Sequence, residues 1–251
     1  MGAATGRALS WIAPATSALL LFAAFLPGPF AWAGFVWCVP LALWAAEEPD
    51  WREWRRTCAL ASGGAWLALL AWLRHVHPPL GIFGWVLLSV YCASYLWLWL
   101  MALRWVMPST NGARLGNRLL TLLGLAGLWV VLEFIRGIAL TGFGWLPLAA
   151  SQAGNPVMLG LCETIGPGGL SGALILGNLA LARWIRRQFT ELRPGALGAA
   201  PRGFFSGLTP EVYLALFPVL AAFWLQVGHL RQDEATAAAG HSRVLRVSAV
   251  Q

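Results

Sequence analysis

The chain has 251 residues, of which 59% are hydrophobic and 11% are charged, and its mean hydropathy is +0.67. A soluble domain carries about 25% charged residues, so this composition excludes a water-covered globule and predicts a surface that faces lipid. All seventeen basic residues are arginine, and the net charge is +7. Because the arginines lie mostly in short loops between apolar runs, they indicate membrane orientation and argue against nucleic-acid binding.

Seven apolar segments are candidates for membrane-crossing helices, each of which needs about 20 residues. We predict these helices at about residues 8–26, 30–46, 57–73, 82–107, 119–138, 170–184 and 211–230. A charged loop is expected at residues 47–56. Because the apolar stretch continues past Ala31-Trp32-Ala33, an uncleaved first helix is favoured over a signal peptide. The pattern predicts an all-α polytopic membrane domain over residues 1–230.

The segment over residues 139–169 is also apolar, but glycine and proline interrupt it repeatedly. It therefore cannot form one regular helix. Irregular backbone at membrane depth is tolerated only where protein or a watery cavity covers it. The interrupting residues are Gly142, Gly144, Pro147, Gly154, Pro156, Gly166, Pro167, Gly168 and Gly169.

The arginines also orient the domain. If the N-terminus lies in the cytoplasm, twelve of the seventeen arginines fall on the cytoplasmic side and five on the other side, in agreement with the positive-inside rule. The broken segment and residues 231–251 are then predicted to face the periplasm. Residues 231–251 are polar at first and end in a partly alternating stretch, 244–250, which is typical of the start of a strand.

Glu133 and Arg136, at the outer end of the fifth predicted helix, are the sharpest local feature. Residues three apart lie on one helix face and can form an ion pair, and ionisable residues inside a membrane usually face protein. The two residues are interpreted either as a structural ion pair or as the wall of a binding site. Trp145, in the glycine-rich loop that follows, suits simple anchoring at the membrane interface.

Other reactive residues form weaker patterns. His75 and His77 lack the carboxylate or cysteine partners of a metal site. Cys162 and Glu163 are adjacent and point apart on a helix, so a catalytic cysteine is not favoured. Three other cysteines, Cys38, Cys58 and Cys92, lie in apolar runs where a small, weakly polar side chain packs well. The sequence predicts no metal site, no cofactor and no disulfide framework.

Several of these residues form an ordered set: Trp129-x-x-x-Glu133-Phe134-x-Arg136-Gly137, then Leu140-Thr141-Gly142-Phe143-x-Trp145, then Ser151-Gln152 and Gly166. This set resembles the membrane-domain signature of the apolipoprotein N-acyltransferase family. The turn at residues 27–32, Trp72 and the stretch 244–251 also fit, so the resemblance extends over essentially the whole chain. Family members usually have proline where Gly144 stands, which is a small departure.

The resemblance implies a two-step covalent transfer. An acyl chain from a phospholipid is held as a thioester on a cysteine and then passed to the free α-amine of the lipidated N-terminal cysteine of an apolipoprotein. In the family, a Glu, a Lys and a Cys of a periplasmic nitrilase-like domain perform this chemistry. This chain contains no lysine, so no catalytic residue is carried over. Trp72, Glu133, Arg136 and Trp145 are candidates for the substrate cleft or an interface.

Residues 231–251 are accordingly interpreted as a linker and the truncated first strand of a missing α/β nitrilase-like domain. The expected protein is the membrane part of an N-acyltransferase of the bacterial inner membrane, incomplete and inactive alone. Its expected partners are a phospholipid acyl donor, a diacylglyceryl apolipoprotein and a separate nitrilase-like domain. Two alternatives stay open: a non-catalytic membrane module that binds lipid or a partner, and a small transporter.

Overall fold

The computed structural model describes residues 3–77, 80–191 and 210–238, and within these ranges it contains helices and no strand. The α-helices are α1 (Ala3–Ala24), α2 (Val39–Ala46), α3 (Trp51–Leu69), α4 (Leu80–Val106), α5 (Leu115–Ile138), α6 (Pro156–Glu191) and α7 (Pro210–Ala238). Short 3-10 helices connect them: η1 (Pro29–Phe35), η2 (Ala71–His75), η3 (Met107–Thr110), η4 (Ala139–Thr141) and η5 (Leu148–Gln152).

Five stretches of the described chain are long and apolar enough to cross a membrane. They are Pro29–Ala46, Leu80–Thr110, Leu115–Ile138, Pro156–Gln188 and Pro210–Gly228. The apolar part of α1, Ser10–Ala24, is shorter, and α3 carries several charged residues in its first turns. The predicted helical membrane fold is confirmed, while length and composition support five of the seven predicted crossings.

Several helix boundaries differ from those predicted. The segment 30–46 is divided into η1 and α2. Helix α3 begins at Trp51, inside the expected charged loop, because Asp50 caps it: one carboxylate oxygen accepts the amide protons of Arg52 and Glu53 at 2.8 and 3.1 Å. Helix α7 continues to Ala238, so the expected linker begins with helix, through residues that mostly favour this conformation. The predicted strand at 244–250 lies outside the described residues.

The segment 139–169 is broken, as predicted, but its second half is more helical than expected. Helix α6 begins at Pro156, fourteen residues before the predicted start. Gly166, with φ 72° and ψ 170°, and Pro167 interrupt α6 internally, so two helical pieces meet at this point. A positive φ of this size suits glycine, and the proline lacks an amide proton.

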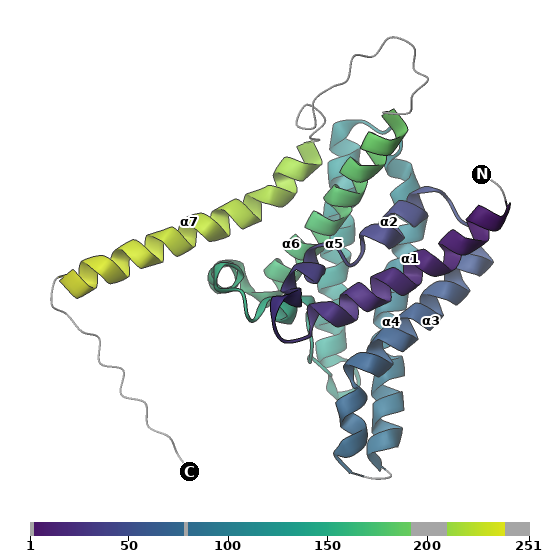
Figure 1. Cartoon of the computed structure of the whole chain (residues 1–251), viewed down its shortest axis with the longest axis horizontal. Coiled ribbons are helices and arrows are strands. Elements are labelled where there is room, and N and C mark those ends of the chain that lie inside the picture. Colours follow the sequence, from purple (N-terminus) through teal and green to yellow (C-terminus); the bar gives the residue numbers. More distant parts are fainter. Residues whose placement is uncertain (1–2, 78–79, 192–209, 239–251) are drawn as a thin grey trace.

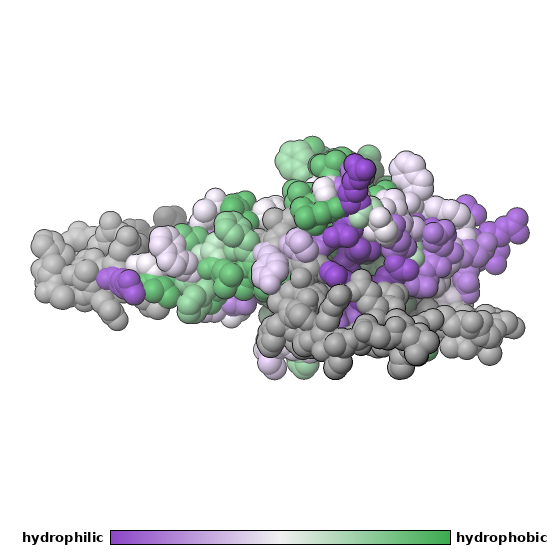
Figure 2. All heavy atoms as spheres, turned by 90° about the horizontal axis from the view of Figure 1, so that it is seen from above, coloured by the Kyte–Doolittle hydropathy of each residue, from purple (hydrophilic) through white to green (hydrophobic). Residues whose placement is uncertain are grey.

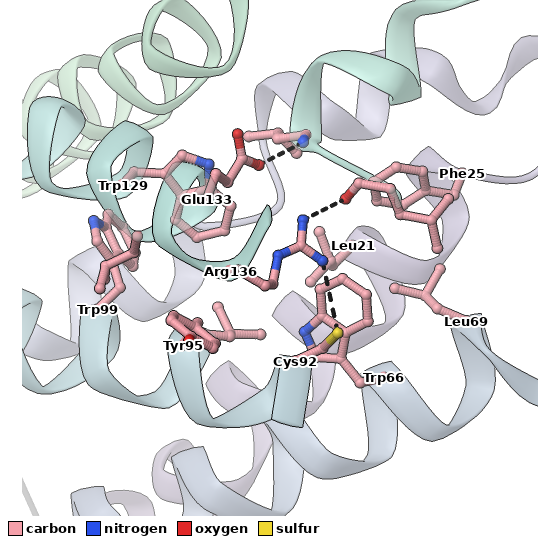
Figure 3. A pocket seen from close by; sticks show the side chains of 14 residues that line it. Leu21, Phe25, Trp66, Leu69, Cys92, Tyr95, Trp99, Trp129, Glu133 and Arg136 are labelled. Atoms are coloured by element: carbon pink, nitrogen blue, oxygen red, sulfur yellow. Dashed lines mark hydrogen bonds between the residues drawn. The ribbon is translucent and has the colours of Figure 1, made fainter. Parts of the chain in front are cut away.

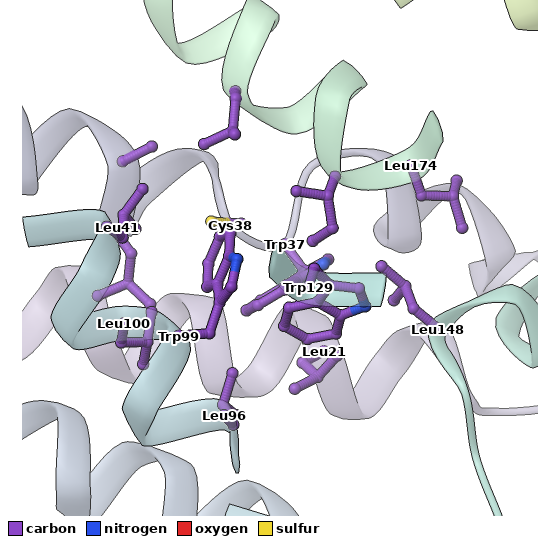
Figure 4. Close-up of a cluster of buried hydrophobic side chains, with 14 of the residues drawn as sticks. Leu21, Trp37, Cys38, Leu41, Leu96, Trp99, Leu100, Trp129, Leu148 and Leu174 are labelled. Atoms are coloured by element: carbon purple, nitrogen blue, oxygen red, sulfur yellow. The ribbon is translucent and has the colours of Figure 1, made fainter. Parts of the chain in front are cut away.

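Helices α4 and α5 stand side by side, and α1 and α3 pass obliquely across them (Figure 1). Helix α6 packs against α5 on one side and against α7 on the other. The core between these helices is rich in tryptophan. Trp37, Trp99 and Trp129 lie together at its centre, with ring centroids 5.2 to 6.1 Å apart (Figure 4). The indole N–H of Trp99 donates to the Leu125 carbonyl at 2.9 Å, which ties α4 to α5.

One end of the bundle, which we call the arginine end, gathers most of the charged side chains. There the start of α3, the end of α4, the start of α5 and the end of α6 meet. Figure 2 looks onto the molecule from this side and shows hydrophilic groups gathered away from α7. The contacts that join the segments include those of Arg104 with the Pro49 carbonyl, Arg183 with Thr110, Arg186 with Glu47, and Arg118 with Glu211.

Candidate functional site

The irregular segment between α5 and α6 begins about halfway along α4. The Tyr91 hydroxyl oxygen lies 2.9 and 3.0 Å from the carbonyl oxygens of Arg136 and Ala139, which share its single proton, and this places the end of α5 beside the middle of α4. The first eleven residues of α4 therefore extend beyond α5 by about 16 Å. Together with η2 they form the projecting hairpin at the bottom of Figure 1.

Arg136 is buried beside this segment, with 3% of its surface exposed. Its guanidinium donates to the carbonyls of Trp145 and Leu146 at 2.9 and 3.3 Å, and it contacts the Cys92 sulfur at 3.7 Å. The guanidinium carbon also lies 4.8 Å from the centre of the Trp66 ring (Figure 3). Carbonyl dipoles and a ring face thus stabilise a charge that would otherwise be costly at this depth.

Glu133, one turn earlier on α5, contacts the same segment further along. Its carboxylate accepts the Leu148 amide proton at 2.6 Å, where η5 begins. The neighbouring amide of Ala149 donates to the Ser171 hydroxyl of α6 at 3.0 Å. Glu133 and Arg136 therefore hold the irregular segment at two points, one on each side of Pro147.

Of the two interpretations of Glu133 and Arg136, the ion pair is not formed. Within the described part of the chain, the salt bridges join other residues: Arg118 with Glu211, and Arg186 with Glu47. The reason lies in the folding of the chain after α5, because it returns carbonyl and amide groups to the two side chains. Helical spacing alone gives no sign of these backbone partners.

The two candidate tryptophans, Trp72 and Trp145, are brought together by the fold. Trp72 belongs to η2 and Trp145 to the loop after η4, and their rings stack with centroids 5.3 Å apart and 24° between planes. Phe143 adds a third ring, 6.2 Å from Trp145 and 16° from parallel. We call these three rings the aromatic wall. Trp72 is 44% and Trp145 59% exposed while Phe143 is half-buried, so the two tryptophans give the wall its open apolar surface.

A small cavity lies behind this loop, between α1, α3, α4 and α5 (Figure 3). Glu133 and Arg136 line it together with Trp66, Trp129 and apolar side chains. Its volume is about 30 Å³, which accommodates a water-sized group and not an acyl chain. Glu133 and Arg136 thus contact other parts of the same chain. The open surface nearby is the aromatic wall.

Gly142 allows the chain to turn back onto α5. It has φ 75° and ψ 139°, and a side chain at this position would overlap the Gly137 carbonyl oxygen. The Phe143 amide beside it donates to the Arg136 carbonyl at 2.9 Å. Two non-glycine residues of the segment, Leu140 and Leu146, also have positive φ values of 51° and 53°. The segment is therefore held in a specific, partly strained conformation.

Sequence reasoning assigned no role to Asn178, a fully buried residue of α6. Its side-chain amide donates to the carbonyls of Gly34 and Leu174 at 2.9 and 2.8 Å and accepts the Cys38 amide proton at 2.8 Å. Gln152, at the end of η5, joins a second element to η1 by donating to the Ala31 carbonyl at 2.8 Å. A single Asn in an apolar run was the available signal.

The weaker candidates are dispersed. His75 and His77 are exposed, and Cys162 is half-buried beside an exposed Glu163. In the described ranges, no three His, Cys, Asp or Glu residues gather to hold a metal ion. The other three cysteines are buried and free, as expected from their apolar surroundings.

The fold is that of a polytopic helical membrane protein. Its irregular segment between α5 and α6 is held in place by Glu133 and Arg136. The profile of the family described as "Apolipoprotein N-acyltransferase N-terminal domain" matches residues 17–180, more than half of the chain. The chain therefore belongs to the apolipoprotein N-acyltransferase family, which confirms the resemblance drawn from the sequence.

Three relatives illustrate the extent of this similarity, all named apolipoprotein N-acyltransferase. The chain is 31% identical to that of Rhodopirellula baltica over 73% of its length, 34% identical to that of Gloeobacter violaceus over 68%, and 31% identical to that of Shewanella oneidensis over 71%. The matched regions cover 34%, 33% and 40% of these relatives, respectively. The similarity thus extends over about a third of each relative's length.

Proposed function

We propose that this chain supplies the membrane part of an enzyme that transfers an acyl chain from a phospholipid to the N-terminal cysteine of a diacylglyceryl apolipoprotein. Family membership supports this activity class. The structural observation that carries the proposal is the aromatic wall of Trp72, Trp145 and Phe143, in which the two stacked tryptophans are exposed.

The aromatic wall suits an acyl chain for two reasons. Stacked ring faces offer a broad apolar surface that makes no demand for hydrogen bonds, as an alkyl chain requires. The loop that carries Trp145 is also fixed from behind, because Arg136 binds the Trp145 carbonyl and Glu133 binds the Leu148 amide. A rigid support of this kind holds a binding surface in one position. We assign Glu133 and Arg136 to positioning and the two tryptophans to contact with the acyl chain.

The transfer chemistry itself is assigned to a nitrilase-like domain that acts together with this membrane domain. The family resemblance implies a lysine in the catalytic group, and these 251 residues contain none. The relatives also extend well beyond the region that this chain matches. We infer that the described membrane domain is inactive without such a domain.

We further propose an orientation in the bacterial inner membrane. The contacts at the arginine end bring Arg104, Arg118, Arg183 and Arg186 to one side of the bundle. The positive-inside rule assigns that side to the cytoplasm and the aromatic wall to the periplasmic side. In this arrangement α1 and α3 complete seven crossings.

The proposal is tested by an acyl-transfer assay in phospholipid micelles. The acceptor is a diacylated lipopeptide with a free amine, and its gain in mass is measured with the chain alone and after addition of a separately expressed nitrilase-like domain from a relative. We expect transfer only when both parts are present. Transfer by the chain alone would refute the assignment of the transfer chemistry to a separate nitrilase-like domain.

Variants connect this assay to the aromatic wall. Trp72→Ala and Trp145→Ala are expected to lower the transfer rate about two- to tenfold, because an aromatic contact contributes about 0.5–1.5 kcal/mol. Trp105→Ala is the matched control, since Trp105 is 76% exposed but lies near the end of α4, away from the wall. An equal loss of transfer rate in all three variants would mean that the aromatic wall has no specific role in binding the acyl chain.

A further inference from the structure

A second cavity opens at the arginine end, between the start of α3 and the last turns of α4. Arg52, Arg55, Arg56 and Trp97 line it, and its volume is about 380 Å³. Pockets that bind small ligands span about 300–1,000 Å³, so this cavity is large enough for a ligand. The cavity beside Arg136, at about 30 Å³, is not.

The helical register of α3 brings the three arginines together. Residues three and four apart lie on one helix face, which applies to Arg52 with Arg55 and Arg56. Helix α4 closes the other side, where the Trp97 indole N–H donates to the Arg55 carbonyl at 3.2 Å. The Arg55 side chain is itself directed back by a hydrogen bond to the Trp51 carbonyl at 3.3 Å. The cavity is thus formed by two packed helices.

The positive charge in this cavity is not neutralised by ion pairs. In the described ranges the salt bridges involve Arg118 and Arg186, and none involves the three arginines of the cavity. The nearby Asp50 carboxylate accepts the amide protons at the start of α3. Glu53 lies on the same turns of the helix, so it offsets part of the charge. Three guanidinium groups against the carboxylates of Asp50 and Glu53 still leave an excess of positive charge, which favours an anionic ligand.

An apolar surface continues from the arginines along α3. Leu60 follows Arg52 and Arg56 at the spacing of one helix face and is 62% exposed. A charged group followed by an apolar side chain, with a tryptophan beside the charged group, matches the order of groups in a phospholipid at a membrane interface.

We propose that this cavity binds the phosphate group of an anionic phospholipid, with an acyl chain lying along Leu60. Guanidinium groups suit this ligand because their planar fork donates two parallel hydrogen bonds to phosphate oxygens. A free phosphate ion shares the same head chemistry. The apolar continuation along α3, at the exposed Leu60, favours the lipid.

The test uses the full chain purified in zwitterionic detergent. Its melting temperature is followed while phosphatidylglycerol, phosphatidylcholine or inorganic phosphate is added at equal phosphate concentration. The variant R52Q/R56Q removes two charges from the cavity. The control R74Q/R114Q removes two charges from exposed arginines outside it. We expect phosphatidylglycerol to bind the wild type and the control equally, and R52Q/R56Q about 25-fold more weakly, at about fivefold for each arginine.

Each alternative outcome contradicts the proposal in a defined way. Equal affinity of R52Q/R56Q and the control would mean that the cavity is not the binding site. Equal binding of phosphatidylcholine would exclude recognition of negative charge, and equal binding of inorganic phosphate would replace the lipid by a free ion. If the glutamine variant does not fold, the variant R52K/R56K is used in its place, because it keeps the charge and the helix. It is expected to bind several-fold more weakly than wild type, because lysine lacks the fork.

Discussion

Two groups of arginine in this protein use the same side chain in opposite ways. Arg136 is buried in the middle of the bundle and directs its guanidinium to two backbone carbonyls, a sulfur and a ring face. Arg52, Arg55 and Arg56 are exposed at the arginine end and surround an open cavity without ion pairs in the described ranges. The first arrangement supports the protein's own backbone, whereas the second leaves hydrogen-bond donors for a ligand.

The difference shows that burial and available space decide what a charged residue in a membrane domain can do. An intramembrane ionisable residue is by default a candidate for a functional site. Arg136 meets that criterion, yet its donors face groups of the same chain and its cavity has room only for a water-sized group. The exposed arginines resemble an ordinary signal of membrane orientation. They nevertheless line a cavity that is large enough for a ligand, which Arg136 does not.

The largest predicted effect concerns Arg136. Arg136→Ala leaves the Trp145 and Leu146 carbonyls without their donors, and hydrogen bonds to charged groups contribute about 1.5–3 kcal/mol each. We expect a loss of about 3 kcal/mol or more, measured as unfolding in mixed detergent micelles. Arg114→Ala, at an exposed arginine, should change the stability by less than about 0.5 kcal/mol. If the two variants unfold alike, the assignment of Arg136 to backbone support is wrong.

The second prediction tests the turn that brings the loop back to α5. Gly142→Ala should destabilise the protein by about 2–3 kcal/mol, because its φ of 75° is strained for alanine and the new methyl group overlaps the Gly137 carbonyl. Gly127→Ala, in the middle of α5 with open space around it, should instead stabilise by about 0.5–1 kcal/mol. Thermal melting of both variants gives the comparison, and effects of equal sign would contradict it.

The third prediction concerns the buried polar link between α6 and η1. Asn178→Leu leaves the Cys38 amide and the Gly34 carbonyl without partners, which should cost about 2 kcal/mol. Asn117→Leu, at an exposed position of α5, is the matched control and should be nearly neutral. Unfolding measurements that show no difference between the two would mean that the backbone of η1 finds other partners.

The smallest effect is expected at Asp50, in the arginine end. Its carboxylate accepts the amide protons of Glu53 and Arg52, and these bonds hold the pKa of Asp50 below its usual value of about 3.9. A lowered pKa stabilises the folded state above the unfolded pKa, and this contribution is lost as the pH falls through the folded pKa. Asp50→Ala should therefore lower the melting temperature slightly at pH 7 and make no difference at strongly acidic pH.

The variant Asp50→Asn distinguishes the hydrogen bonds of the N-cap from the negative charge of Asp50. Asparagine is a good N-cap that does not titrate in this range, so this variant should keep most of the wild-type melting temperature at pH 7. Its melting temperature should also depend less on pH below about 4. If Asp50→Asn and Asp50→Ala were equally destabilised, charge and not capping would explain the effect.

Much of the helical fold could be predicted because hydrophobic length is a strong signal. The predicted fourth and fifth helices match α4 and α5 within a few residues. The early start of α3 was also readable, since Asp50 and Glu53 have the spacing of a capping box. The division of residues 30–46 into η1 and α2 was not, because an apolar run does not reveal where backbone hydrogen bonds change partner.

The candidate site was predictable as a set of residues but not as a set of contacts. The order of Glu133, Arg136 and Trp145 indicated the family, yet the partners of the two charged residues depend on how the following loop folds back. The stacking of Trp72 on Trp145 and the bonds of Asn178 join residues far apart in the chain. Such contacts follow from tertiary packing and leave no trace in local spacing.

The unequal reach of α4 and α5 has a consequence for the surrounding lipid. Helix α5 ends beside Tyr91, whereas α4 continues for another eleven residues, or about 16 Å. A bilayer around the protein therefore contacts two helices of different apolar length, and a hydrophobic mismatch arises at the shorter helix, α5. Lipids there must thin or tilt to cover the end of α5, so acyl chains next to the aromatic wall are expected to be less ordered than those along α4.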